Sequence, residues 1–284
     1  MRAAAAAAAA DVVRRRAAGI VPRVGLVLAT GLGALADGLD DRVEIPFADL
    51  PGFRPPTVDA GRLVLGRRFA TPVAVLDGRT HVYEGATPEE IATPLRTLAR
   101  LGCDSVILTC AAGSLNPAHR PGSLVALSDH LNLSGFDPLI ADDDDDVARP
   151  RCGPRFPSLA EVYDPALRAG LVATAQDAGR FLDEGVYLGV TGPSFVTPAE
   201  VRAYRTLGAD LVGVAVVPEA IVARHAGLKI AAVAVVTNPG GQSLTHERTL
   251  EVPADGAFGP RRGQAAERGG EELAAILARF LEDA

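Results

Sequence analysis

The sequence predicts an α/β protein built as a single domain, with a central β-sheet flanked by helices. Short runs rich in Val, Ile and Leu alternate with helical segments along all 284 residues, which is typical of α/β folds. Apolar residues make up 48% of the chain, aromatic residues 5%, and Trp is absent, so the expected core is aliphatic, as around buried parallel strands. Neither a repeat nor a linker divides the chain, and we therefore expect one domain over residues 1–284.

The predicted strands are short apolar runs that end at glycine, proline or polar residues. They cover Val24–Leu28, Val73–Leu76, Ser105–Thr109, Leu124–Leu127, Val186–Val190, Leu211–Val214 and Ile230–Val236. Runs of this length and composition favour strands that are buried within the sheet.

Helix-start signals lie between several of these strands. Thr87 is followed by proline at the first helical position and by Glu90 at the third, which is the pattern of a capping box. The same pattern recurs at Thr197, and Gly208 is expected to end the helix that starts there. An amphipathic helix is expected over Glu271–Leu281.

Residues 1–20 are expected to form a leading helix. The run Ala3–Ala10 is too short and too weakly hydrophobic for a signal-peptide core or a membrane span. No later segment offers about 18 consecutive apolar residues, so we expect no membrane partner.

The net charge indicates which binding partners are expected, and the cysteine content indicates the cellular compartment. A net charge of −7 repels nucleic acid and anionic membranes, although a local basic pocket can still hold a small anion. The cysteines Cys103, Cys110 and Cys152 show neither metal-site spacing nor an even disulfide framework. A reducing, cytoplasmic location is the simplest interpretation.

The segment of residues 138–157 interrupts the α/β pattern. It contains four prolines and five consecutive aspartates, Asp142–Asp146, with little apolar periodicity. Adjacent like charges repel and resist packing, so a mobile, solvated loop is expected. A metal site is the alternative, but sequential carboxylates cannot all converge on one ion.

Polar or glycine residues follow several strands at the edge where α/β sheets bind ligands. Thr30-Gly31-Leu32-Gly33 offers backbone amides and a hydroxyl to an anion, although a plain strand-to-helix turn explains the same residues. A dinucleotide-binding fingerprint is disfavoured because Ala36 stands where its third glycine belongs. Arg79 and His81 lie two residues apart and supply donors for an oxyanion.

Three more strand ends carry candidate binding residues. The small residues after Thr109 allow main-chain amides to reach a ligand, or they reflect tight packing. Phe195, just before a helix start, suggests a stacking wall for a planar base. Asn238 ends an apolar strand, where a buried amide must find partners, and a structural turn is the alternative.

Taken together, these segments are more specific than any of them alone. Their order resembles that of the trimeric purine nucleoside phosphorylases, from about Gly25 to the C-terminal helix. The segments are GLG, GRTHVYEG, AAGSLNP, SDHLNLSG, RFPSLAEVYD, GPSFVTPAE, LGADLVGVAVVPEAIVARHAGL and TN. The resemblance implies a mixed, partly barrel-like sheet, a homotrimer, and attack of inorganic phosphate on a nucleoside. It implies no metal and no organic cofactor.

The resemblance also implies a role for individual residues at matching positions. For phosphate these are Thr30, Arg79, His81 and the amide of Ala111; for the sugar, Tyr83, Val214, His246 and Phe156; for the base, Phe195, Val196 and Asn238. Asn238 and His81 are the residues expected to act in catalysis, and Phe156 is expected to reach a neighbouring subunit's site.

Several positions depart from the family pattern. Val196 stands where a glutamate usually grips the purine, and Ala215 stands where a hydroxyl residue usually contacts phosphate. Asp59 replaces a usual histidine, and a carboxylate near phosphate repels it unless it is protonated or turned away. Val214 replaces a methionine, and Cys110 replaces an asparagine.

Three hypotheses follow from this pattern. The first is a phosphorylase for 6-oxopurine nucleosides, which forms the free base and a pentose 1-phosphate. The second is a diverged phosphorylase or nucleoside-cleaving enzyme for another base or a modified sugar. The third, which the changes at Ala215 and Asp59 would permit, is a nucleoside-binding protein with little catalytic power.

Overall fold

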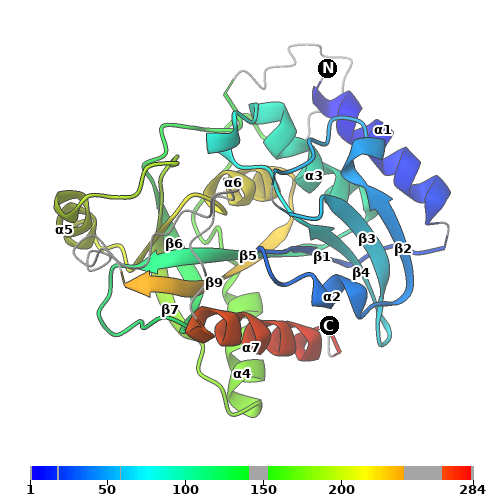
Figure 1. The fold of residues 1–284 in the computed structure, drawn as a ribbon. Coiled ribbons are helices and arrows are strands. Elements are labelled where there is room, and N and C mark those ends of the chain that lie inside the picture. Colours follow the sequence, from blue (N-terminus) through cyan, green and yellow to red (C-terminus); the bar gives the residue numbers. More distant parts are fainter. Residues whose placement is uncertain (1, 18, 58, 141–152, 240–263, 283–284) are drawn as a thin grey trace.

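The computed structural model describes residues 2–17, 19–57, 59–140, 153–239 and 264–282, which form one α/β domain (Figure 1). The strands are β1 (Val24–Val27), β2 (Asp40–Pro46), β3 (Arg62–Arg68), β4 (Thr71–Asp77), β5 (Ser105–Ser114), β6 (Leu124–Asn132), β7 (Asp183–Gly189), β8 (Leu211–Gly213) and β9 (Lys229–Pro239). The helices are α1 (Arg2–Arg16), α2 (Ala34–Asp37), α3 (Pro88–Leu101), α4 (Pro165–Asp177), α5 (Pro198–Thr206), α6 (Val217–His225) and α7 (Gln264–Phe280), with 3-10 turns η1 (Phe47–Asp49) and η2 (Val82–Glu84).

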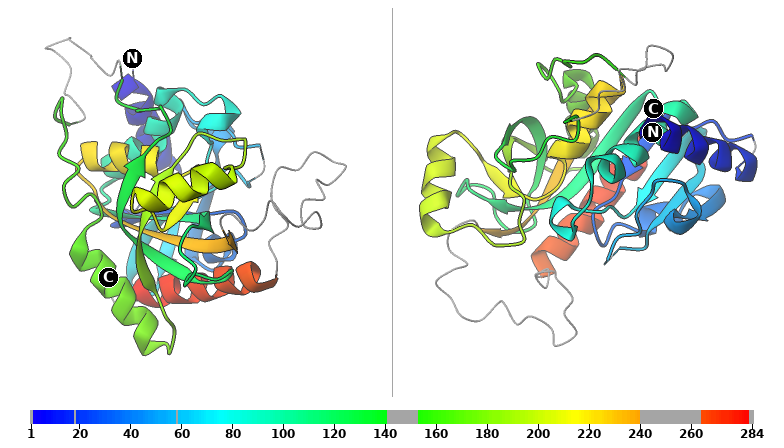
Figure 2. Two further views of the ribbon diagram at one scale, coloured as in Figure 1. Left: turned by 90° about the vertical axis from the view of Figure 1, so that its left-hand side faces the viewer. Right: turned by 90° about the horizontal axis from the view of Figure 1, so that it is seen from above.

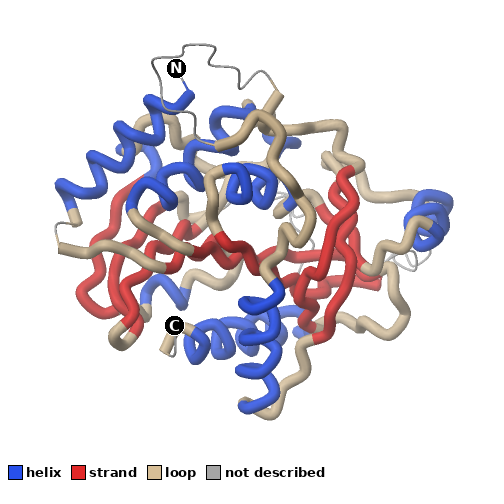
Figure 3. The backbone as a smooth tube through the Cα atoms, turned by 180° about the vertical axis from the view of Figure 1, so that it is seen from behind, coloured by secondary structure: helices blue, strands red, loops and turns tan. Residues whose placement is uncertain are grey.

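The sheet has an open part and a closed part. Strands β2, β3, β4, β1 and β5 follow one another as an open sheet, whereas β5, β8, β7, β6 and β9 close into a barrel because β9 also pairs with β5. The first half of β5 pairs with β1 and its last two residues pair with β8, so β5 belongs to both parts. Seen from behind, the strands form two groups on opposite sides of the molecule (Figure 3).

The two faces of the sheet are covered by different helices. Alternate residues of a strand point to opposite faces, so Val27 and Leu108 join the core under α1, α3 and α6. Leu26 and Ile107 instead join the core under α2, α4 and α7. Helix α5 lies apart from both layers, beyond the barrel strands (Figures 1 and 2).

All seven predicted strands are present, but several are longer than expected. The prediction ended the central strand at Thr109, and this is wrong, because β5 continues to Ser114 through pairing with β9 and β8. Strands β2 and β3 were not predicted. In β2 only Ile45 is fully buried, so this edge strand shows no apolar run.

Both predicted capping boxes are confirmed. The Glu90 amide donates to the Thr87 hydroxyl over 3.2 Å, and the Glu90 carboxylate accepts from the Thr87 amide over 2.8 Å. Thr197 caps α5 in the same way, and α5 ends at Thr206, shortly before Gly208. The C-terminal helix is longer than predicted, since α7 begins at Gln264.

The structure describes the predicted leading helix but only part of the predicted acidic loop. Helix α1 covers most of residues 1–20. The five aspartates of the predicted acidic loop lie outside the described residues. Within the described ranges, no helix combines the length and the apolar character needed to cross a membrane.

Candidate active site

The predicted ligand residues lie where the open sheet meets the barrel. Strands β4, β1, β5 and β9 are mutually parallel along the sheet, so their carboxyl ends point the same way, although β5 and β9 continue beyond the level at which β1 and β4 end. Thr30 follows β1, Arg79 and His81 follow β4, and Asn238 lies near the end of β9. Ligands of α/β proteins bind at this kind of edge, and we therefore place the candidate active site there.

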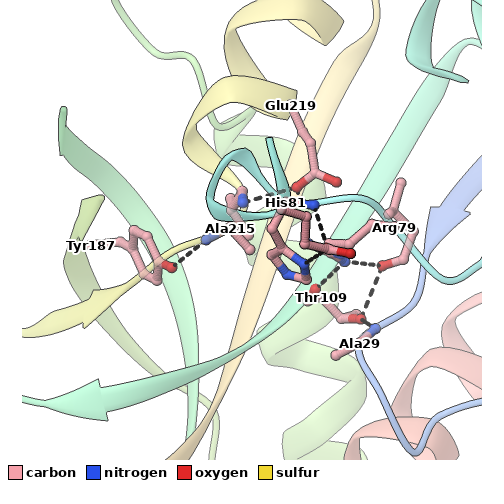
Figure 4. A network of polar contacts seen from close by, with 10 residues as sticks. Ala29, Arg79, His81, Thr109, Tyr187, Ala215 and Glu219 are labelled. Carbon is pink, nitrogen blue, oxygen red and sulfur yellow. Dashed lines mark hydrogen bonds and ion pairs between the residues drawn. The ribbon is translucent and has the colours of Figure 1, made fainter. Parts of the chain in front are cut away.

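Arg79 is the central cation of this edge (Figure 4). Its side chain is buried, and Nη1 lies 3.0 Å from the Glu219 carboxylate at the start of α6. Its Nη2 donates to the carbonyl of Val27 over 3.1 Å and also to the carbonyl of Thr109. One guanidinium therefore ties the ends of β4 and β1 and the middle of β5 to a helix on one face of the sheet.

Glu219 holds the turn that enters α6. Its carboxylate accepts from the Val216 amide over 2.9 Å, and Val216 has a left-handed backbone with φ of 67°. A β-branched residue adopts that conformation only where the surroundings enforce it. Because Glu219 also compensates the buried charge of Arg79, this pair fixes both the turn and the cation.

His81 is oriented by Glu84. The imidazole Nδ1 lies 2.9 Å from the Glu84 carboxylate, and the His81 backbone amide donates to the same oxygen over 2.8 Å. A carboxylate only accepts hydrogen bonds, so the hydrogen of this contact belongs to Nδ1 and leaves Nε2 for a ligand. The ring also stacks on Tyr83, with centroids 4.9 Å apart.

The electrostatic state of Glu84 follows from its partners. Burial raises the pKa of Glu84, but hydrogen bonds from Thr57 and His81 lower it by more, so the net pKa lies below the usual value. Glu84 therefore stays ionised through the neutral pH range and keeps its hold on the His81 ring.

Tyr187 supports the segment after β8. Its hydroxyl is fully buried and accepts from the Ala215 amide over 3.3 Å, as Figure 4 shows. A Cβ atom at Gly213 would overlap this hydroxyl, so only glycine fits there. Burial raises the pKa of Tyr187 well above its usual value, which keeps the phenol neutral.

Tyr83 and Val214, predicted at the sugar, lie close to each other at Gly192. A Cβ atom at Gly192 would lie 3.0 Å from Val214 Cγ1 and 3.6 Å from Tyr83 Cδ1. Glycine at position 192 thus lets the backbone pass close to Tyr83, which follows the open-sheet strand β4, and to Val214, which follows the barrel strand β8.

Asn238 is held across the β5–β9 pair. It lies opposite Gly113, and its carboxamide oxygen accepts from the Thr237 hydroxyl over 2.8 Å. A Cβ atom at Gly113 would lie 3.5 Å from Asn238 Nδ2. The amide nitrogen is therefore the part of Asn238 left to donate to a ligand.

The remaining predicted residues are less closely tied to this edge. Phe195 is 58% exposed, and Phe156 is 86% exposed. Val196 packs against the small cluster of Leu115, Leu188, Val201, Ala209 and Val212. Ala111 lies within β5, beyond the predicted strand end at Thr109. His246 lies outside the described residues.

Several supporting residues carried no signal in the sequence. Glu219 and Tyr187 meet their partners only through the fold, because Arg79 and Glu219 are 140 residues apart. Glu84 is different, since a carboxylate three residues after His81 is a local pattern that points to an oriented histidine. Among the described residues, no group of three or more metal-ligating side chains is present.

The sequence pattern shared by the phosphorylase superfamily matches residues 23–282, nearly the whole chain. The chain belongs to the phosphorylase superfamily. Purine nucleoside phosphorylase 1 of Geobacillus stearothermophilus is 41% identical over 237 residues, covering 81% of this chain and 85% of that protein. The purine nucleoside phosphorylase of Bos taurus is 38% identical over 244 residues, covering 81% and 83%.

Solved structures of the superfamily agree with the fold. Purine nucleoside phosphorylase from Schistosoma in complex with hypoxanthine superimposes with a TM-score of 0.81 at 30% identity, over 98% of this chain and 96% of that chain. The predicted family resemblance and the predicted mixed, partly barrel-like fold are both confirmed.

Proposed function

We propose that the chain is a purine nucleoside phosphorylase, a pentosyltransferase that cleaves a nucleoside reversibly with inorganic phosphate. A phosphate oxygen forms a bond to the anomeric carbon while the bond from that carbon to the base nitrogen breaks. The products are pentose 1-phosphate and the free base, which keeps the electrons of the broken bond and takes up a proton. The observation that carries the proposal is the convergence of Arg79, His81, Tyr83 and Asn238 on one edge of the sheet.

We assign phosphate to the ends of β1, β4 and β5. Arg79 supplies a fixed positive charge, His81 supplies Nε2, and Thr30 and the Ala111 amide complete the set. Such groups act mainly by holding the anion in line and by stabilising charge as it develops. Inorganic phosphate is the co-substrate, and the proposed reaction needs neither a metal nor an organic cofactor.

We assign the nucleoside to the barrel side of the edge. Tyr83 and Val214 flank the sugar, while Phe195 and Val196 flank the base. The Asn238 amide nitrogen donates to the base and stabilises the negative charge that it gains on leaving. His246 and Phe156 stay proposed sugar contacts.

A homotrimer in the cytoplasm completes the proposal. Phe156 is 86% exposed, and a large apolar ring on the surface suits burial against a second copy of the chain. The buried thiols Cys103 and Cys110 form no disulfide, which suits a reducing compartment.

One observation favours a second candidate, a phosphorylase for a base other than a 6-oxopurine. Val196 packs into an aliphatic cluster and has no group that accepts a proton from the base. A carboxylate at this position would add charged hydrogen bonds worth about 1.5–3 kcal/mol each, and valine adds none.

The test is base release from inosine, guanosine, adenosine and a pyrimidine nucleoside, with and without phosphate. We expect purine release only with phosphate, together with pentose 1-phosphate in equal amount. Release without phosphate would show hydrolysis instead, and saturable binding without turnover would show a binding protein. A preference for a base other than hypoxanthine or guanine would support the second candidate.

A further inference from the structure

Asp59 lies at the proposed phosphate site and is already bonded to one of its residues. The Thr30 hydroxyl donates to the Asp59 carboxylate over 2.7 Å. A Cβ atom at Gly78, the residue before Arg79, would lie 2.7 Å from Asp59 Cβ. The Asp59 side chain therefore sits between the ends of β1 and β4, where the anion is proposed to bind.

This contact changes what Thr30 offers to an anion. A threonine hydroxyl has one hydrogen, and here that hydrogen points to Asp59. Both side chains then present only lone pairs to an incoming ligand. A fully deprotonated oxyanion, which also has only lone pairs, is repelled at this point of the site.

The basic side chains nearby already have carboxylate partners. Arg79 is paired with Glu219, and His81 with Glu84. At the end of β8, Ala215 has no hydroxyl, and its amide donates to Tyr187.

Arg54 bonds the carbonyls of Glu84 and Gly85 and pairs with Glu90 over 3.5 Å. Arg62, three residues after Asp59, pairs with Asp77 at the end of β4 over 2.8 Å. Among the described residues, the guanidinium groups of Arg79, Arg54 and Arg62 thus each face a carboxylate, and Asp59 adds one more carboxylate to these pairs. Within the part of the chain that the structure describes, each of these three cations already has a carboxylate partner, so none of them is left to match a second negative charge on the ligand.

We propose that Asp59 makes this site selective for a singly charged, protonated oxyanion, dihydrogen phosphate, whose P–OH group donates to the Asp59 carboxylate. This inference rests on the proposed phosphorolysis. A ligand hydrogen aimed at the carboxylate replaces repulsion by a charge-assisted hydrogen bond. Asp59 is then a specificity-determining residue for the nucleophile.

The expected pH dependence of the phosphate KM follows from the fraction of phosphate that is present as dihydrogen phosphate. Above the second ionisation of phosphate, that form falls about tenfold per pH unit, so the KM for total phosphate rises by the same factor. Tyr83, Glu84, Arg79 and His81 share the site with Asp59. Because these groups also face the anion, the wild-type pH profile alone does not isolate Asp59.

The decisive experiment compares Asp59→Asn with wild type and with Asp177→Asn, an exposed carboxylate at the end of α4. Phosphate KM is measured at about pH 6, 7 and 8, and sulfate is tested as a competitive inhibitor, because sulfate is a dianion without a hydrogen to donate. Asparagine keeps the size of Asp59 and accepts from Thr30, but it removes the charge.

We expect a steep rise of phosphate KM with pH in wild type and Asp177→Asn, and a rise at least about tenfold smaller across this range in Asp59→Asn. Sulfate should inhibit Asp59→Asn at least tenfold more strongly than it inhibits wild type. Equal pH profiles and equal sulfate inhibition in active enzymes would overturn the inference while leaving phosphorolysis intact.

Two further measurements keep the test decisive. If neither wild type nor Asp59→Asn cleaves a nucleoside, the proposed function fails. Calorimetric titration of phosphate and of sulfate still compares the binding of the two anions directly. If Asp59→Asn does not fold, Asp59→Ser removes the charge with a smaller side chain. Sulfate that binds wild type as tightly as phosphate at about pH 6 would also overturn the inference.

Discussion

The open sheet and the barrel contribute to the candidate site in different ways. On the open-sheet side, contacts between ionisable side chains dominate, as in the pairs of Arg79 with Glu219 and of His81 with Glu84. On the barrel side, backbone spacing and aliphatic packing dominate, with Gly213 under Tyr187 and Val196 in its cluster. The open-sheet side should therefore respond to changes of charge, and the barrel side to changes of shape.

The largest expected effect is loss of the buried ion pair. Arg79→Met leaves the Glu219 carboxylate buried without its partner, and we expect a loss of about 3–5 kcal/mol in the free energy of unfolding. Denaturant titration measures it. Arg23→Met, which breaks an exposed pair with Asp104, should cost about 0–1 kcal/mol. Similar losses in the two variants would show that burial does not set the strength of the Arg79–Glu219 pair.

Next in size is the effect of Asn238→Ala on turnover. Because the Asn238 amide is assigned to the leaving base, we expect kcat to fall about 100-fold, with a smaller change in phosphate KM. Steady-state kinetics with each substrate varied separates the two effects. Asn132→Ala, which loses contacts only within its own loop, serves as the control. A larger change in phosphate KM than in kcat would show that Asn238 acts on the anion side.

A smaller effect is expected where Gly213 passes the Tyr187 hydroxyl. Gly213→Ala forces a Cβ against that oxygen, and we expect a loss of about 1–3 kcal/mol in stability. Tyr187→Phe alone removes the hydrogen bond to Ala215, worth about 1 kcal/mol. The double variant should recover part of the loss, because the overlapping oxygen is gone. Strictly additive losses in a double-mutant cycle would rule out this overlap.

The smallest effect concerns the base. Val196→Glu places a carboxylate where it can accept the N1 hydrogen of a 6-oxopurine, which adenine lacks. We expect the ratio of kcat/KM for inosine over adenosine to rise about tenfold. Val196→Gln has the same length without the charge and should change the ratio less. An unchanged ratio in Val196→Glu would show that residue 196 does not face the base.

Local sequence signals predicted the elements that depend on local physics. The Thr87 and Thr197 caps were predictable because a capping box needs only four consecutive residues. The edge strand β2 escaped prediction because it buries only Ile45 and leaves no apolar run. The closure of the barrel was implied by the family resemblance but not by any local pattern, since it depends on pairing between β5 and β9.

The sequence by itself determined the fold class, the family and the strand ends that carry Thr30, Arg79, His81 and Asn238, because apolar periodicity and short motifs are local properties. Only the tertiary structure decided which carboxylates meet these residues. Glu219 reaches Arg79 across 140 positions, and Asp59 reaches Thr30 across 29. Such contacts depend on how strands and helices pack, and they decide the net charge that an anion meets in this site.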